Sequence, residues 1–171
     1  MSLPTQIDPR KLALQGITLE GEFFAKHLPR LSASVEAVNS SLSATLEFTR
    51  DQSRQPLVKG EAKISVDVIC QRCLDLMSIE INAAIALQVI WSEDRIANVS
   101  PDYEPWIVVD KIADLAVVLE DELLLALPIV NYHNPGECTG NAVVSKATNT
   151  NDDDEEAVAD SPFSVLKQLK H

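Results

Sequence analysis

Two long alternating stretches, joined by a short polar link, constrain the fold of this chain most. From Val58 to Cys70, small or apolar residues occupy every second position, and mostly charged or polar residues fill the positions between them. The alternation resumes in a new phase from Met77 to Trp91. A period of two predicts a strand with one buried face and one exposed face. We therefore expect a β-hairpin over residues 58–91, with both strands longer than about five or six residues.

Shorter patterns on either side predict further strands. Residues 33–37 and 42–48 alternate in the same way, and the turn signal Asn39-Ser40-Ser41 separates them. The short apolar run 106–109 predicts a fifth strand. The apolar residues of 23–31 are interpreted as a helical turn or irregular segment packed on the sheet. Successive strands with short links predict an antiparallel β-meander of four to five strands.

Two sequence signals predict helices in the first 138 residues. Asp8 is a capping residue and Pro9 suits the first helical position, so a short N-terminal helix begins there. Asp114 caps a longer helix over about 115–127, whose apolar residues recur near helical spacing, and Pro128 ends it. We expect this long apolar helix to cover one face of the sheet. The predicted fold class is therefore α+β.

The length of 171 residues suggests one folded domain, which we place at 1–138. Residues 139–160 lack apolar periodicity and contain a run of five carboxylates, so we expect an acidic flexible linker. At 161–171 a capping serine and a proline precede apolar residues that share one helical face. This pattern predicts a short amphipathic C-terminal helix that docks on the chain's own core or on a partner. Its apolar face consists of Phe163, Leu166 and Leu169.

The charge of the chain is unevenly distributed. Its formal net charge is −12; residues 1–73 are close to neutral, and the acidic excess lies in 74–171. Acidity disfavours binding to a phosphate backbone, so any nucleic-acid contact is expected in the N-terminal half. The acidic half suits a basic protein partner. No apolar run is long enough for a membrane helix, and Asp8 precedes any sustained apolar stretch, so we expect a cytoplasmic protein.

A pair of cysteines separated by two residues lies in the link of the predicted hairpin. Cys70 and Cys73 have the spacing with which two thiolates bind one tetrahedral zinc ion, and His133 and Cys138 could complete the site. Two other interpretations stay open. Cys70 can be an ordinary buried residue beside an idle Cys73 thiol. The pair can also be a redox dithiol, although that motif normally begins a helix.

Five basic residues around the predicted loop and hairpin form the candidate set for a nucleic-acid contact. Lys59 and Lys63 share parity and project to the same side of a strand. Glu61 and Asp67 interrupt the set, and no aromatic residue is interleaved for base stacking. An ordinary mixed-charge sheet face is the alternative interpretation. The set is Arg50, Arg54, Lys59, Lys63 and Arg72.

Three consecutive acids, Glu120, Asp121 and Glu122, lie in the predicted long helix. Three carboxylates suggest a metal-dependent nuclease, but adjacent helical positions point about 100° apart and do not converge on one ion. A solvated helix face is the favoured interpretation. A protein-binding contact is the alternative, because the acids lie beside the apolar face.

Several short motifs occur together in an order and spacing that resemble the YceD family, long labelled a domain of unknown function. They are Cys70-Gln71-Arg72-Cys73-Leu74, Tyr103-Glu104-Pro105, Glu120-Asp121-Glu122 followed by 124–128, His133 with Cys138, and Ser161-Pro162-Phe163 with Leu166 and Lys170. The resemblance implies a role in accumulating or processing large-subunit ribosomal RNA. It implies no enzymatic reaction, and it carries over no catalytic residue.

Our leading interpretation is therefore a non-enzymatic ribosome biogenesis factor that acts on large-subunit precursor rRNA or on a ribosomal protein. The alternative is a zinc-stabilised protein-interaction module that binds a basic ribosomal protein without touching RNA. An enzyme such as a nuclease is the third hypothesis. We infer no small-molecule substrate and no membrane partner.

Overall fold

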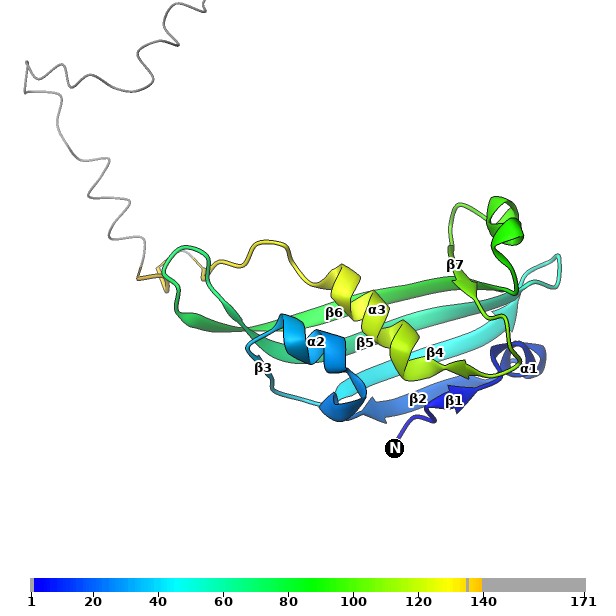
Figure 1. Cartoon of the computed structure of the whole chain (residues 1–171), viewed down its shortest axis with the longest axis horizontal. Coiled ribbons are helices and arrows are strands. Elements are labelled where there is room, and N and C mark those ends of the chain that lie inside the picture. The colour runs from blue at the N-terminus through cyan, green and yellow to red at the C-terminus, as the bar shows by residue number, and fades with distance from the viewer. Residues whose placement is uncertain (1, 135, 140–171) are drawn as a thin grey trace, which may run out of the picture. The chain divides into compact units, whose positions relative to one another are not determined.

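The computed structural model describes residues 2–134 and 136–139 (Figure 1). The chain divides into two compact units, Met1–His133 and Asn134–His171, and the helices and strands of the described residues all lie in the first. From residue 140 onward, the predicted linker and docking tail lie outside the described residues. The elements are β1 (Gln6–Ile7), α1 (Pro9–Gln15), β2 (Thr18–Phe23), η1 (Ala25–His27), α2 (Pro29–Ser34), β3 (Ala37–Val38), β4 (Leu42–Arg50), β5 (Pro56–Ile69), β6 (Leu76–Ile90), η2 (Glu93–Asn98), β7 (Glu104–Ile107), β8 (Ala113–Asp114) and α3 (Leu115–Ala126).

The predicted long hairpin is confirmed. Strands β5 and β6 have 14 and 15 residues and pair antiparallel from Ile69↔Leu76 to Leu57↔Gln88. Their alternating sequence explains the pairing, because side chains such as Ile64 and Ile81 all turn to the buried face. The hairpin is the centre of a six-stranded sheet with the order β2-β4-β5-β6-β7, and β3 pairs with β5.

The predicted antiparallel meander is wrong at both ends of the sheet. Strand β7 pairs with β6 in parallel, so the sheet is mixed. The connection through η2 turns the chain back before β7 starts, and an apolar run such as 106–109 carries no information about direction. At the other edge, β2 and not the segment 33–37 pairs with β4, and β3 pairs with β5 instead.

The strand predicted at 33–37 is also wrong. Residues 29–34 form helix α2, and only Ala37–Val38 pair as β3. Alternation over five residues is too short to distinguish a strand from a helix. The N-cap position of α2 is Leu28, which provides no side-chain cap, so Pro29 at the first helical position is the only local signal for the start of this helix.

Both helix starts predicted from capping residues are confirmed. Asp8 accepts a hydrogen bond from the Lys11 N–H, and α1 ends at Gly16, whose φ of 64° suits glycine. Asp114 accepts hydrogen bonds from the N–H groups of Ala116 and Val117 at the start of α3. The α+β class is confirmed.

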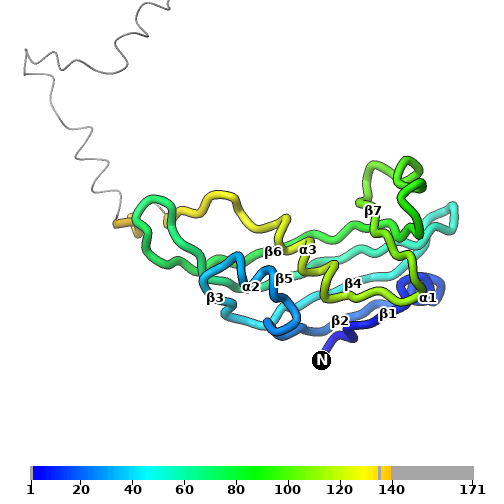
Figure 2. The backbone as a smooth tube through the Cα atoms, viewed as in Figure 1, coloured from blue at the N-terminus to red at the C-terminus, as the bar shows by residue number. Residues whose placement is uncertain are grey.

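The cover of the sheet is not one long helix. Helix α3 has 12 residues and packs on β5 and β6 through fully buried side chains that include Leu119 and Leu123. Helix α2 lies beside α3, as Figure 2 also shows, and α1 packs against β4 and β5. Burying each large aliphatic side chain in this layer contributes about 1.5–3 kcal/mol. Three short helices therefore share the role that the sequence assigned to one.

Among the described residues, no helix has both the length and the apolar character needed to cross a membrane.

Candidate functional site

The turn that joins β5 to β6 holds the two neighbouring cysteines. The Leu74 N–H donates to the Cys70 carbonyl at 2.9 Å, and the Cys70 N–H donates to the Asp75 carbonyl at 2.9 Å. Leu74 has a φ of 63°, a left-handed conformation that non-glycine residues rarely adopt. These contacts fold the link tightly enough to bring Cys70 and Cys73 side by side, as their spacing predicts.

The segment after α3 runs along this turn and positions His133. The Gln71 N–H donates to the Asn131 carbonyl at 2.9 Å, and the Gln71 side chain donates to the Ile129 carbonyl at 3.2 Å. The guanidinium of Arg72 lies 5.1 Å from the ring centroid of Tyr132. Backbone pairing and this cation–π contact therefore fix a segment that is remote in sequence against the tip of the hairpin.

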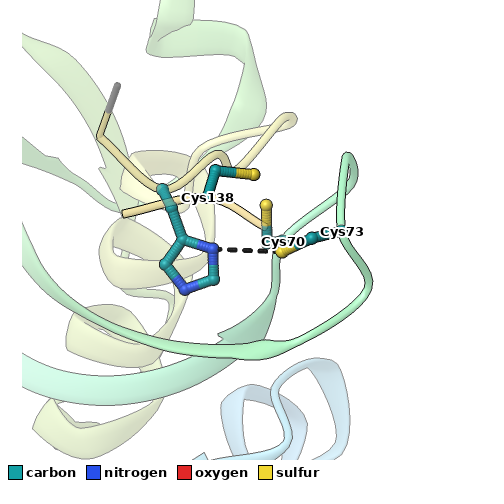
Figure 3. A group of neighbouring side chains, drawn as sticks. Cys70, Cys73 and Cys138 are labelled. Carbon is teal, nitrogen blue, oxygen red and sulfur yellow. Dashed lines mark hydrogen bonds between the residues drawn. The ribbon is translucent and has the colours of Figure 1, made fainter. Parts of the chain in front are cut away.

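The four predicted metal ligands converge. One ligand atom from each of Cys70, Cys73, His133 and Cys138 lies within 4.8 Å of the others (Figure 3). Cys70 and Cys138 are buried, and the other two are half-buried. Ligands at the corners of a tetrahedron around zinc stand roughly 3.7 Å apart when each bond is about 2.3 Å. The observed arrangement is thus close to the one that an ion requires.

The hydrogen bonds of His133 select the ring nitrogen that faces the thiols. Its Nε2 lies 3.2 Å from the Leu76 carbonyl oxygen, which can only accept, so Nε2 carries the proton. In the neutral ring the other nitrogen, Nδ1, is then the unprotonated one, and it lies 3.3 Å from the Cys73 sulfur. A carbonyl that orients a histidine through its far nitrogen is the usual outer-shell partner of a metal ligand.

The surroundings of Cys70 favour its thiolate. Burial opposes ionisation of the thiol, but hydrogen bonds to the sulfur outweigh burial and lower the pKa of Cys70 to about 5. The donors are the backbone N–H groups of Cys73, His133 and Arg72 and the Cys73 side chain. A thiolate is the form that binds metal, so the turn prepares Cys70 for that role.

Residues 58–170 match the family described as large ribosomal RNA subunit accumulation protein YceD. This chain belongs to the YceD family. The large ribosomal RNA subunit accumulation protein YceD of Haemophilus influenzae is 31% identical to it over 172 residues, which cover 99% of this chain and 97% of the relative. No solved structure matches the chain significantly. The part matched to the YceD family begins in β5 and includes all four candidate metal ligands.

In this YceD-family chain, the five candidate RNA-binding residues occupy different places. Arg50 and Arg54 lie at the β4–β5 loop, whereas Arg72 lies beyond the other end of β5. At about 3.4 Å per residue, the 14 residues of β5 separate its ends by roughly 45 Å. Lys63 lies between them and forms a 3.0 Å ion pair with Glu61. The set therefore does not form one patch.

Lys59 has an aromatic neighbour that the sequence did not reveal. Its ammonium lies 5.1 Å from the ring centroid of Tyr103, in the segment just before β7. The interaction with the Tyr103 side chain raises the pKa of Lys59, and Glu47 and Asp102 add to the effect. The motif Tyr103-Glu104-Pro105 singled out Tyr103 in the sequence. Only the pairing of the strands reveals that Tyr103 lies beside β5.

The exposed face of the sheet is mostly acidic. Residues opposite one another in the register share a face, which places six carboxylates and two lysines, Lys59 and Lys63, on the exposed side of β2, β4, β5 and β6. The carboxylates are Glu20, Glu22, Glu47, Glu61, Asp67 and Glu80. The charged lining of a depression of about 500 Å³ on this face consists of Glu20, Glu22, Glu61 and Lys63. Such a face repels phosphate and attracts basic groups.

The three consecutive acids of α3 have different environments. Glu120 is only 2% exposed, and its carboxylate binds Arg30 and Leu31, so the interpretation as a solvated face is wrong for this residue. Asp121 pairs with the exposed Arg30 side chain. Burial first, and then the charges of Glu104 and Asp121, raise the pKa of Glu122. The other predicted partner-binding residues, Phe163, Leu166 and Leu169, lie outside the described residues.

Proposed function

We propose that this chain promotes the accumulation of large-subunit ribosomal RNA in the cytoplasm as a non-enzymatic factor. The observation that carries the proposal is the similarity, over nearly the full length of both chains, to a relative named for that role. The name describes accumulation of an RNA and no reaction, which supports a binding role. The partner in this proposal is the precursor rRNA itself or a ribosomal protein that joins it early.

A zinc ion bound by Cys70, Cys73, His133 and Cys138 is part of the proposal. Three thiolates and one imidazole are a donor set of structural zinc sites, and four protein ligands leave no open position for catalysis. The bound ion would supply a fixed link between the hairpin tip and the segment that follows α3. The carbonyl of Leu76 supports this assignment because it holds His133 in the tautomer that a metal requires.

The direct test removes the gene and measures the ratio of large-subunit to small-subunit rRNA. We expect the ratio to fall and the parent gene to restore it. The Cys73→Ser gene should restore it less well, because a serine hydroxyl does not replace a zinc thiolate. A deletion strain with a normal ratio would refute the proposed role.

The acidic sheet face supports a second candidate function, in which the chain holds a basic ribosomal protein instead of RNA. Six carboxylates against two lysines on one uncovered face are complementary to a Lys/Arg-rich segment. Crosslinking in growing cells distinguishes the two candidates by recovering either RNA or a basic protein. Replacing Glu20 and Glu61 with Gln should weaken capture of the protein. The matched control is the exposed pair Glu93 and Asp94 on η2, replaced with Gln and Asn.

A further inference from the structure

A polar pocket lies where the β4–β5 loop meets the end of β6 and the segment that contains η2. Its volume is about 380 Å³, which is within the size range of small-molecule sites, roughly 300–1,000 Å³. Ile90 is an apolar part of its lining, and Asp51 lies at its loop side. The remaining lining consists of Ser53, Gln55, Gln88, Arg95, Asn98 and Ser100.

Three carboxamides make this lining unusual, because each offers both a donor and an acceptor. Gln88 is only 5% exposed, although it is polar, and its side-chain oxygen accepts a hydrogen bond from the Ser100 N–H at 3.3 Å. That bond turns the amide of Gln88 in a fixed direction at the base of the pocket. Gln55 and Asn98 face the same space from the loop and from η2.

Arg95 is held in place by a stack of cations and an aromatic ring. Its guanidinium carbon lies 4.6 Å from the centroid of the Trp91 ring, and that of Arg10 lies 4.7 Å from the same centroid. Arg10 is fixed in turn by a hydrogen bond from its side chain to the Val108 carbonyl. A guanidinium that is already ordered loses less entropy when it binds a ligand.

The chemistry of the pocket matches an unpaired nucleobase. Asn and Gln carboxamides pair with base edges in two-bond arrangements, and an arginine plane stacks on a base face. The one carboxylate of the lining, Asp51, already accepts the Gln55 N–H at 2.7 Å, which closes the loop. With Ile90 as its apolar part, the lining offers little to an aliphatic side chain of a protein partner.

Two exposed cations adjoin the pocket. Arg50 is the last residue of β4 and Arg54 lies on the β4–β5 loop, and the ion pairs found among the described residues involve neither of them. They can therefore contact phosphates that flank a bound base. Glu93 and Asp94 begin η2 nearby, so this end of the molecule is not strongly basic. Base contacts must then supply much of the affinity.

We propose that this pocket binds one unpaired base of a single-stranded RNA. The carboxamides of Gln55, Gln88 and Asn98 bind the edge of the base, Arg95 covers it, and Arg50 and Arg54 contact the adjoining phosphates. This inference rests on the proposed function, because it names the site through which the chain would touch large-subunit RNA.

The test measures binding of the full chain to fluorescently labelled ten-nucleotide RNAs of A, U or C, to an RNA duplex of equal length, and to AMP as competitor. We expect the single strands to bind more tightly than the duplex, with a preference among bases. Asn98→Ala should weaken binding about fivefold or more and reduce the preference. Arg95→Lys keeps the positive charge but removes the planar guanidinium that stacks on the base. It should weaken binding nearly as much as Arg95→Gln.

Arg54→Gln should act differently, because it removes a phosphate contact. We expect the same base preference and a salt slope that is smaller by about 0.7. The matched controls are Asn82→Ala, an exposed amide on the sheet face, and Lys26→Gln, an exposed cation on η1. Both should bind like the parent. Thermal unfolding of every variant verifies that each one folds.

Several results would overturn the inference: no RNA bound by the parent, unchanged binding in both the Asn98 and Arg95 variants, or equal losses in the controls. AMP competing as well as the RNA would assign the pocket to a free nucleotide instead. A deletion strain with normal large-subunit rRNA would refute the proposed function, whatever the pocket binds. If that rRNA falls and the Arg95→Gln gene restores it fully, the proposed function stands and the pocket has no part in it.

Discussion

The buried carboxylate of Glu120 accepts a 2.7 Å hydrogen bond from the backbone N–H of Arg30, 90 positions earlier in the chain. The same oxygen accepts the Leu31 N–H at 3.0 Å, and the second oxygen accepts from the Arg30 side chain at 3.0 Å. Glu120 of α3 therefore caps the first turn of α2, whose own N-cap residue offers no side chain for this purpose.

Replacing Glu120 with Ala should destabilise the fold. The substitution leaves buried N–H groups of α2 without an acceptor, and it should lower the free energy of unfolding by about 2–3 kcal/mol. Denaturant unfolding measures the change. Asp121→Ala is the control, because this exposed ion pair contributes only about 1 kcal/mol or less. Equal effects of the two substitutions would contradict the capping role.

Chelation should lower the melting temperature of the parent. Metal bound only by the folded state stabilises it by about 2.7 kcal/mol when free zinc is 100 times its dissociation constant. Cys73→Ser should lower the melting temperature in the same direction and make the protein insensitive to the chelator. Metal analysis of gently purified protein checks occupancy. If the purified protein contains no zinc and the chelator leaves the melting temperature unchanged, the proposed zinc site is wrong.

Gly60→Ala should destabilise the centre of the sheet. An added Cβ would lie 1.9 Å from the backbone oxygen of Thr45 on the neighbouring strand, so β4 and β5 would have to separate. We expect a loss of about 2–3 kcal/mol or more in the free energy of unfolding. Gly16→Ala is the comparison, since its Cβ meets open space and only its positive φ opposes the change, at about 1–2 kcal/mol. A smaller loss at Gly60 than at Gly16 would contradict this argument.

Asp67 gives a pH-dependent contribution to stability. Hydrogen bonds from Ser78 first, and then from Asn39, lower the pKa of Asp67 in the folded chain. A lowered folded-state pKa means that the stabilisation is present above the unfolded pKa and is lost as pH falls through the folded one. Ser78→Ala should raise the pKa of Asp67 toward its ordinary value. The variant should have a lower free energy of unfolding than the parent at neutral pH, and this difference should shrink in acid. Carbon-detected NMR titration measures the pKa, and Ser65→Ala on the same strand should leave it unchanged.

Sequence alone determined the features that depend on neighbouring residues. The alternation of 58–91 specifies a hairpin because one slip in register would expose every buried side chain. Asp8 and Asp114 specify helix starts because a cap acts on N–H groups two or three residues away. The same pattern placed Cys70 and Cys73 in the link of the hairpin. Their spacing suggested a zinc site, and His133 and Cys138 have side chains that can complete its set of ligands.

Tertiary structure alone decided what depends on contacts between distant segments. Helix α2 extends into residues 33 and 34, where alternation suggested a strand, and its cap comes from Glu120. The direction of β7 follows from the turn through η2, and the stack of Arg10 and Arg95 on Trp91 follows from packing of α1 near the end of β6. Local propensity and periodicity carry no information about such pairs, because chain folding sets their separation in space independently of their separation in sequence.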